Sequence, residues 1–369
     1  MRKSIILFIS LFLLSCEYVA AGDFSQFTQF ASNPVTTATT SWEGYPSHGN
    51  IEDGSLIQVG STIYRFYCAG YPSFNTGYEY ISAASYPGGT WTKSANPVVY
   101  ANQFYSGAGV AACAARVIPM QDGSYRMYLH AFDGTHYDRG YMLTATAGGF
   151  PDTWTIGNGG NAIFTESGSG FDSWQIQTQG VVPSWESNDG LWHLFYVGYN
   201  QTTFSGGHAT SSDGITWSNR SQVMSPSGSS WYATHLIPVG YRKIGSKFYI
   251  TVDGFGNPTG CSDNSQLWRV GYYETEDLNN LGTVHGPIIE PIPGGWNSCG
   301  VEGAELFQET SGRVSITFLG APTLYNPGGG NGYSSGVALN TSFIPRGVSN
   351  FGQGGKLTNL GQGGKIGGF

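Results

Sequence analysis

Acidic residues gather at two places in a chain that is otherwise poor in charge. Charged residues make up only 11% of the 369 residues, yet Glu52 and Asp53 stand together near the start, and Glu302 and Glu305 lie close together near the end. A protonated carboxylic acid and a carboxylate on either side of one bond can act as general acid and base, the chemistry that cleaves glycosidic bonds. Such chemistry requires a fold that brings these two distant segments to one place.

Tryptophans repeat along the chain at a fixed interval. Trp91, Trp154 and Trp217 are each 63 residues apart (154 − 91 = 63; 217 − 154 = 63), and each follows a threonine. A short β-type run precedes each of them, such as Tyr141-Met142-Leu143-Thr144-Ala145 before Trp154. A constant period of this length indicates a repeat architecture.

A second pattern gives the number of repeats. A glycine-containing turn followed by an aromatic-rich strand occurs five times, which predicts five β-hairpins. The five strands after the turns are Ile63–Tyr67, Tyr125–Leu129, Trp192–Tyr196, Phe248–Val252 and Val314–Phe318. About four short strands in each of five units predict an all-β, five-bladed β-propeller between about residues 45 and 345, with residues 23–44 closing the ring against the last blade. A two-sheet sandwich, the alternative, offers no reason for five equal units.

In a propeller the first residues of each innermost strand converge on one funnel at the axis. From the sequence we expect Asp53 to be the general base and Glu302 the general acid, with Glu305 as the substitute if the register is shifted. The alternative is that Asp53 bonds turn amides and Glu302 pairs with Arg116. The remaining residues expected to bind a substrate are Arg116, Gln177, Gln179 and His235 at strand starts, and Trp174, Trp231 and Trp296 in the preceding loops.

Aromatic faces in those loops suit stacking on sugar rings, although packing in the core is the alternative. We assign Trp91, Trp154 and Trp217 to packing between blades. No phosphate-binding loop, Ser-His-Asp order or metal-spaced ligand cluster is visible in the sequence. We therefore expect no cofactor and no metal ligands, with an axial Ca²⁺ or Na⁺ left open.

Composition and termini indicate export. The net charge of −8 argues against nucleic-acid binding, which needs a basic face. Residues 1–21 have a basic start and a short apolar core, typical of a signal peptide; Cys16 in Leu13-Leu14-Ser15-Cys16 offers the alternative of a lipid anchor. Residues 22–346 form the propeller domain. Residues 347–369 are a glycine-rich tail with a nine-residue repeat, expected to be flexible or to serve attachment or assembly.

Four cysteines remain after the leader, as suits disulfides in a secreted or periplasmic protein. Their positions favour the pairs Cys68–Cys113 and Cys261–Cys299 among three connectivities. The oligomeric state stays open.

Three segments carry a resemblance to the five-bladed glycosidases of glycoside hydrolase family 43 and their invertase-like relatives. The segment from Glu52 to Gly60 resembles the first-blade motif that holds the family's general base, at Asp53. The segment from Val301 to Phe307 resembles the motif that holds the general acid, at Glu302. The phrase Ser212-Asp213-Gly214-Ile215-Thr216-Trp217 resembles one shared across the superfamily. The resemblance implies a carbohydrate substrate, such as a plant or algal polysaccharide or its oligosaccharides.

The chain departs from that pattern at three points. The family's acid lies in the fourth blade, whereas the fourth position here holds Thr234 and His235 and the glutamate comes in the fifth. Gln177 or Gln179 stands where the family has an aspartate that tunes the pKa of the acid, and Asp53 is followed by glycine rather than proline. A non-catalytic carbohydrate-binding or surface-display propeller is therefore the rival interpretation.

Overall fold

A computed structural model describes residues 23–43, 51–52, 54–70, 79–86, 91–104, 111–132, 138–228, 230–256, 258–263, 266–309, 312–323 and 333–340. Within these ranges the chain is almost entirely β-structure, as predicted, and its helical elements are four single 3₁₀ turns. No helix in the described ranges is both long and apolar enough to cross a membrane. The predicted signal peptide, the glycine-rich tail and Asp53 lie outside the described residues.

The strands follow one another as antiparallel meanders. The first meander is β2 (Gly54–Val59), β3 (Thr62–Gly70), β4 (Glu79–Tyr86) and β5 (Thr92–Lys93). The second is β6 (Ala112–Pro119), β7 (Tyr125–Ala131), β8 (Arg139–Ala145) and β9 (Thr155–Ile156). The third is β10 (Gln175–Val182), β11 (Trp192–Tyr199), β12 (Phe204–Ser211) and β13 (Ser218–Met224).

The remaining strands form two further meanders. They are β14 (His235–Ile244), β15 (Lys247–Phe255), β16 (Arg269–Thr275) and β17 (His285–Ile289), and then β18 (Val301–Gln308), β19 (Val314–Gly320) and β20 (Ser334–Asn340). The last of these is completed by β1 (Phe27–Gln29), which pairs with β20. The 3₁₀ turns are η1 (Ser41–Glu43), η2 (Ala101–Gln103), η3 (Asn158–Gly160) and η4 (Gly170–Asp172).

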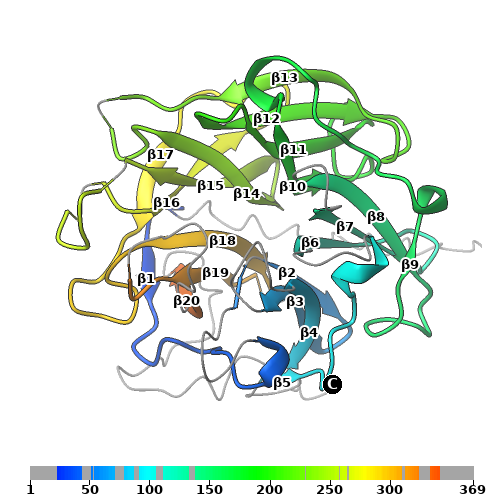
Figure 1. Cartoon of the computed structure of the whole chain (residues 1–369), viewed down its shortest axis with the longest axis horizontal. Helices are drawn as coiled ribbons and strands as arrows, with labels where there is room; N and C mark the ends of the chain where they lie inside the picture. The colour runs from blue at the N-terminus through cyan, green and yellow to red at the C-terminus, as the bar shows by residue number, and fades with distance from the viewer. Residues whose placement is uncertain are drawn as a thin grey trace, which may run out of the picture.

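Figure 1 shows these meanders, hereafter called units, arranged around a common centre, with the first strand of each unit nearest to it. The hydrogen-bonded sheets number four among the described residues, because one parallel pair, Ser205 with Leu236, joins the third and fourth units into a single eight-stranded sheet. None of these sheets closes on itself within the described ranges. The all-β class is thus confirmed, and the count of five blades stays a prediction.

The hairpin turns adopt the geometry that their glycines predict. Between the first and second strand of every unit the turn contains a glycine in the left-handed region, where a Cβ atom is unfavourable. These glycines are Gly60 (φ 61°), Gly123 (82°), Gly190 (76°), Gly245 (64°) and Gly312 (85°). The five β-hairpins predicted from the sequence are therefore all present in the structure.

The core lies between neighbouring units. The ring of Trp154, in the second unit, meets Phe66 of β3 edge to face at 5.7 Å. Trp217, the residue before β13, lies 6.5 Å from Tyr128 of β7. These contacts confirm for Trp154 and Trp217 the prediction that the periodic tryptophans pack one unit against the next. Trp91 instead lies at the edge of a cluster around Tyr67, in its own unit.

Three ties hold the ring of units in place. Residues 23–43 supply β1, so the expectation that this segment joins the last unit is confirmed. The two predicted disulfides are both present: Cys68–Cys113 ties the end of β3 to the start of β6, and Cys261–Cys299 ties the loop before β16 to the segment before β18. Both bridges therefore cross from one unit to the next.

Candidate functional site

The axis of the molecule is filled by Arg116 of β6. Its Nε donates to the carbonyl oxygens of Gln179 and Val239, at 3.1 Å each, and its Nη2 donates to Oε1 of Gln179 (2.8 Å) and again to Val239 (2.7 Å). Its Nη1 donates to the carbonyl oxygen of Gly54 and lies 3.8 Å from Oε2 of Glu305. One side chain thus links β6 with the inner strands β2, β10, β14 and β18.

These contacts place three of the predicted substrate-binding residues in the interior. Arg116, Gln179 and Glu305 expose only 4%, 2% and 7% of their surface. Glu305 also fits against Gly240 so closely that a Cβ atom there would lie 1.9 Å from Oε2. The three side chains hold the inner strands together, and direct substrate contact by them stays a prediction.

Glu302 lies near the start of β18 and is half-buried. The pairing of β18 with β19 shifts between Glu302, opposite Leu319, and Glu305, opposite Thr317, so an extra residue is accommodated there as a β-bulge. Similar shifts interrupt β6, β10 and β14. The bulge separates the partly exposed Glu302 from the buried Glu305.

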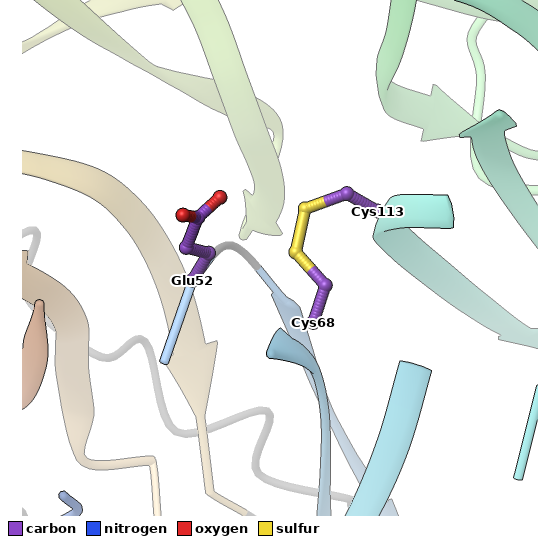
Figure 2. Close-up of side chains that lie close together, drawn as sticks. All are labelled: Glu52, Cys68 and Cys113. Atoms are coloured by element: carbon purple, nitrogen blue, oxygen red, sulfur yellow. A yellow bond between two sulfur atoms is a disulfide. The ribbon is translucent and has the colours of Figure 1, made fainter. Parts of the chain in front are cut away.

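Asp53, the candidate general base in the first unit, is outside the described residues, so only the preceding residue, Glu52, can be described. Glu52 donates its backbone N–H to the carbonyl oxygen of Cys68 (2.7 Å) and is half-buried. Figure 2 shows its carboxylate beside the Cys68–Cys113 disulfide. One Glu52 carboxylate oxygen and the two sulfurs lie within 4.8 Å of one another, in the one group of possible metal ligands found in the described part of the chain. Since disulfide sulfurs carry no thiolate, this group is unsuited to hold a metal ion.

A buried carboxylate that the sequence analysis did not select lies against the third unit. Asp138, just before β8, accepts hydrogen bonds on Oδ2 from the side-chain amides of Gln175 (2.5 Å) and Gln177 (3.1 Å). It exposes 3% of its surface and has a φ of 30°, unusual for a non-glycine residue. The site therefore has an aspartate next to Gln177, the position where the glycosidase pattern has an aspartate and this chain has glutamine. An acid three residues before the predicted strand Tyr141–Ala145 was the available signal.

Aromatic rings line the start of the fourth unit around His235. The imidazole stacks on Phe255 at 5.4 Å and on Trp268 at 5.7 Å, and Phe204 meets it edge-on at 5.1 Å. Tyr199 stacks in turn on Phe204 at 4.1 Å. Burial lowers the pKa of His235, an effect partly offset by the Thr234 backbone, so the neutral imidazole is favoured. We call these five rings the aromatic wall.

The three predicted sugar-stacking tryptophans have different surroundings. The ring of Trp231 lies over Gly254 and Gly271, where an added Cβ would come within 2.2 Å and 2.7 Å of it. Trp296 covers Gly320 in the same way. Both rings are half-buried, and each packs one face against the backbone of these glycines. Trp174, in contrast, is 41% exposed. Sugar contact by these rings stays a prediction, for which Trp174 has the most accessible surface.

Comparison with known proteins identifies the fold. No protein-family model matches the chain, and no curated protein sequence matches it either. Among solved structures, a β-1,2-mannobiose phosphorylase from Listeria innocua has 14% sequence identity and a TM-score of 0.61, covering 86% of this chain and 98% of that one. An endo-1,4-β-xylanase from Bacteroides thetaiotaomicron has 14% identity and a TM-score of 0.56, covering 78% and 89% of the two chains.

A thermostable family-43 glycoside hydrolase is similar at 15% identity, with a TM-score of 0.56, over 80% of this chain and 91% of that one. At such low identity the likeness extends to the backbone and not to individual side chains. The resemblance noted in the sequence is thus confirmed at the level of architecture: the chain has the fold of the propeller glycosidases and glycoside phosphorylases.

Proposed function

We propose that the protein is an exported glycoside hydrolase that cleaves a plant or algal polysaccharide or its oligosaccharides. The observation that carries the proposal is the position of Glu302, a half-buried carboxylate near the start of an inner strand in a fold shared with glycosidases. Glu52, next to Asp53, precedes another inner strand, and Asp138 adds a third acidic segment. A paired-carboxylate site requires two carboxyl groups on either side of the scissile bond, and acids from different units can supply them.

In this mechanism Glu302 is the general acid and Asp53 the base. Protonated Glu302 gives its proton to the glycosidic oxygen as the bond to the anomeric carbon breaks. Asp53 either takes a proton from the attacking water or attacks the anomeric carbon itself. In the second case water, deprotonated by Glu302, then breaks the bond between Asp53 and the sugar. A low-dielectric site with neighbouring carboxylates separates the two pKa values, which keeps one group protonated and the other ionised.

The aromatic wall supports a carbohydrate as the substrate. Tyr199, Phe204, His235 and Phe255 are each partly exposed, so they offer apolar surface interrupted by polar ring atoms. Sugar rings present apolar C–H faces flanked by hydroxyls, which such a surface complements. Arg116 already places a cation at the axis, so the proposal includes no axial Ca²⁺ or Na⁺.

The proposal includes export and a closed ring. Two disulfides suit a protein that matures outside the cytosol. Residues 1–21 would be the signal peptide, with lipidation at Cys16 as the alternative. Five blades of four strands, the last completed by β1, would then surround the site.

Release of reducing sugar from arabinans, xylans, fructans and agars tests the proposal. We expect turnover of at least one of them by the wild type, and a loss of at least about 100-fold in kcat for Asp53→Asn and for Glu302→Gln. Asp152→Asn, an exposed acid in the loop before β9, should keep full activity. An inactive wild type, or full activity in both carboxylate variants, contradicts the proposal.

A non-catalytic carbohydrate-binding propeller is the second candidate, favoured by the exposed ring of Trp174 and by Gln177 in place of an aspartate. It predicts glycan-array binding without turnover. The distance between the carboxyl groups of Asp53 and Glu302 in a ligand complex separates the two functions. About 5 Å indicates retention and about 6.5–9.5 Å inversion, whereas a distance well beyond this range excludes hydrolysis by the pair.

A further inference from the structure

The segment that leads into Glu302 is tied to the fourth unit by a disulfide. Cys299, which lies shortly before Glu302, is bonded to Cys261 in the loop between β15 and β16. Cys299 is buried, with 3% of its surface exposed, whereas Cys261 is half-buried. A covalent bond therefore joins the chain just before the proposed general acid to the neighbouring unit.

Backbone contacts continue this tie up to the residue before Glu302. The N–H of Val301 donates to the carbonyl oxygen of Trp268, at the end of the same loop, at 3.0 Å. Gly300 lies so close to this tryptophan that an added Cβ atom would be 3.3 Å from the Cβ of Trp268. The loop between β15 and β16 thus holds residues 299–301 at two points, through Cys261 and through Trp268.

The pairing of β18 with β19 gives Glu302 little support of its own. Two residues, Val301 and Glu302, pair with β19 before the register shifts, and pairing resumes at Glu305. Such a bulge interrupts the ladder of hydrogen bonds and bends the strand locally. The direction of the Glu302 side chain therefore depends on what fixes the chain before it, and that is the loop of the fourth unit.

General acid catalysis makes this direction important. The acid has to lie within about 2.6–3.2 Å of the oxygen that it protonates, and a displacement of about 1 Å can lower the rate on the order of 100-fold. Glu302 is half-buried, so part of its side chain is accessible to a substrate. A contact that fixes the chain just before the acid thus acts on the rate of bond cleavage rather than on the affinity for the substrate.

We propose that the Cys261–Cys299 bridge is a positioning element for Glu302: together with Trp268 it fixes residues 299–301, and so holds the carboxyl group of the general acid at the leaving oxygen. The inference rests on the proposed function for the role of Glu302. The anchoring of residues 299–301 is independent of any substrate and is measured without one.

Hydrogen exchange under native conditions measures the anchoring first. In Cys261→Ala/Cys299→Ala we expect the amide of Val301 to exchange at least about tenfold faster than in the wild type, because local opening of this segment becomes easier. The matched control is Cys68→Ala/Cys113→Ala, which removes the other bridge between units. The two bridges span 38 and 45 residues, so both variants should lose similar stability, but the control should leave the exchange of Val301 unchanged.

Kinetics on a glycoside found in the panel then tests the positioning. Cys261→Ala/Cys299→Ala should lower kcat/KM about tenfold, with the whole loss in kcat and KM unchanged. A dinitrophenyl glycoside of the same sugar has a leaving group that departs without a proton, so its kcat/KM should fall by less than about twofold. A purely structural defect would lower both reactions equally. Leu278→Ala, which creates a cavity in the turn after β16, is the destabilised control and should keep wild-type kcat/KM on both substrates.

The possible outcomes separate the two proposals. If Val301 exchanges as in the wild type, or if kcat/KM falls equally on both substrates, the positioning role is overturned although hydrolysis stands. If no glycoside is cleaved but exchange rises in Cys261→Ala/Cys299→Ala alone, the hydrolase proposal fails while the anchoring of residues 299–301 is upheld.

Should that variant not fold, a water-soluble phosphine can open the bridge in the folded wild type at the half-buried Cys261. Water then supplies the hydrogens of the two thiols and the oxygen of the phosphine oxide. Wild-type kcat/KM on the glycoside after this reduction overturns the proposal.

Discussion

A pair of buried histidines should make the stability of this protein depend on pH between 7.5 and 5. His193 of β11 and His208 of β12 expose 1% and 4% of their surface, and Nδ1 of His193 lies 2.9 Å from Nε2 of His208. Nε2 of His193 lies 3.0 Å from Oδ1 of Asp189. The ring of His208 also stacks on Phe195, at 4.9 Å.

Protonation of His208 is strongly disfavoured. Burial, and next the charge on His193, lower the pKa of His208 to about 4 from its ordinary value of 6.5. The unfolded chain therefore binds a proton at His208 between pH 6.5 and 4 that the folded chain does not bind. Stability from this group is complete above pH 6.5 and falls as the pH drops toward 4. From the two pKa values the loss between pH 7.5 and pH 5 is about 2 kcal/mol.

Urea unfolding at pH 7.5 and pH 5 measures this loss. His208→Gln keeps a group that can hydrogen-bond to His193 but cannot titrate, so its stability should change by about 2 kcal/mol less than that of the wild type between the two pH values. His285→Gln, at an exposed histidine of β17, is the control and should behave as the wild type. Asp189 does not contribute in this window: burial raises its pKa, but hydrogen bonds, chiefly from His193, outweigh this and lower it to about 2. An equal loss in His208→Gln and wild type would refute the argument.

Three further changes should affect stability. Arg116→Met removes the axial guanidinium and leaves a buried carboxylate without its cation, so we expect a loss of about 3–5 kcal/mol in urea unfolding; Arg116→Lys, with one nitrogen in place of three, should restore little of it. Replacing Cys68 and Cys113 by alanine opens a loop of 45 residues and should cost about 2–4 kcal/mol, measured as a lower urea midpoint. Burial raises the pKa of Glu43, but hydrogen bonds from Lys93 and backbone amides outweigh this and lower it; Glu43→Gln should therefore lose about 1–3 kcal/mol at pH 7 and less at pH 3.

Much of the fold could be predicted because it rests on local and periodic features. Turn glycines and aromatic strands recur in every unit, and each predicted hairpin strand lies inside an observed one. The disulfide pairs could be predicted because the repeat places Cys68 and Cys113 in neighbouring units. The packing of Trp154 and Trp217 followed from the same period.

The arrangement of side chains within the site could not be predicted, because it depends on features that do not repeat along the sequence. A β-bulge adds one residue to a strand and reverses which side chains point to each face beyond it. Strict alternation from the strand start therefore could not separate the buried Arg116 and Glu305 from the half-buried Glu302. Asp138 was missed for another reason: it sits just before a third strand, which reaches the funnel only once the meanders are folded.

The repeat itself helps to separate acids of the fold from acids of the site. In the first unit the buried carboxylate of Glu43 in η1 accepts the hydroxyl of Tyr67 (3.0 Å) and the ammonium of Lys93 (2.7 Å). The third unit repeats this arrangement, with a carboxylate in η4, a tyrosine of the second strand and a cation of the fourth strand. Its members are Asp172, Tyr196 and Arg220.

An acid that recurs at an equivalent place with equivalent partners serves a structural need that the first and third units share: it joins the turn before the first strand to the second and fourth strands. Glu302 and Asp138 have no such counterparts among the described residues of the other units. Asp138 is bound by amides of the next inner strand. Burying a carboxylate is costly, and these acids do not repeat the structural role that Glu43 and Asp172 share. The acids without counterparts in other units are therefore those to which we assign the proposed catalytic function.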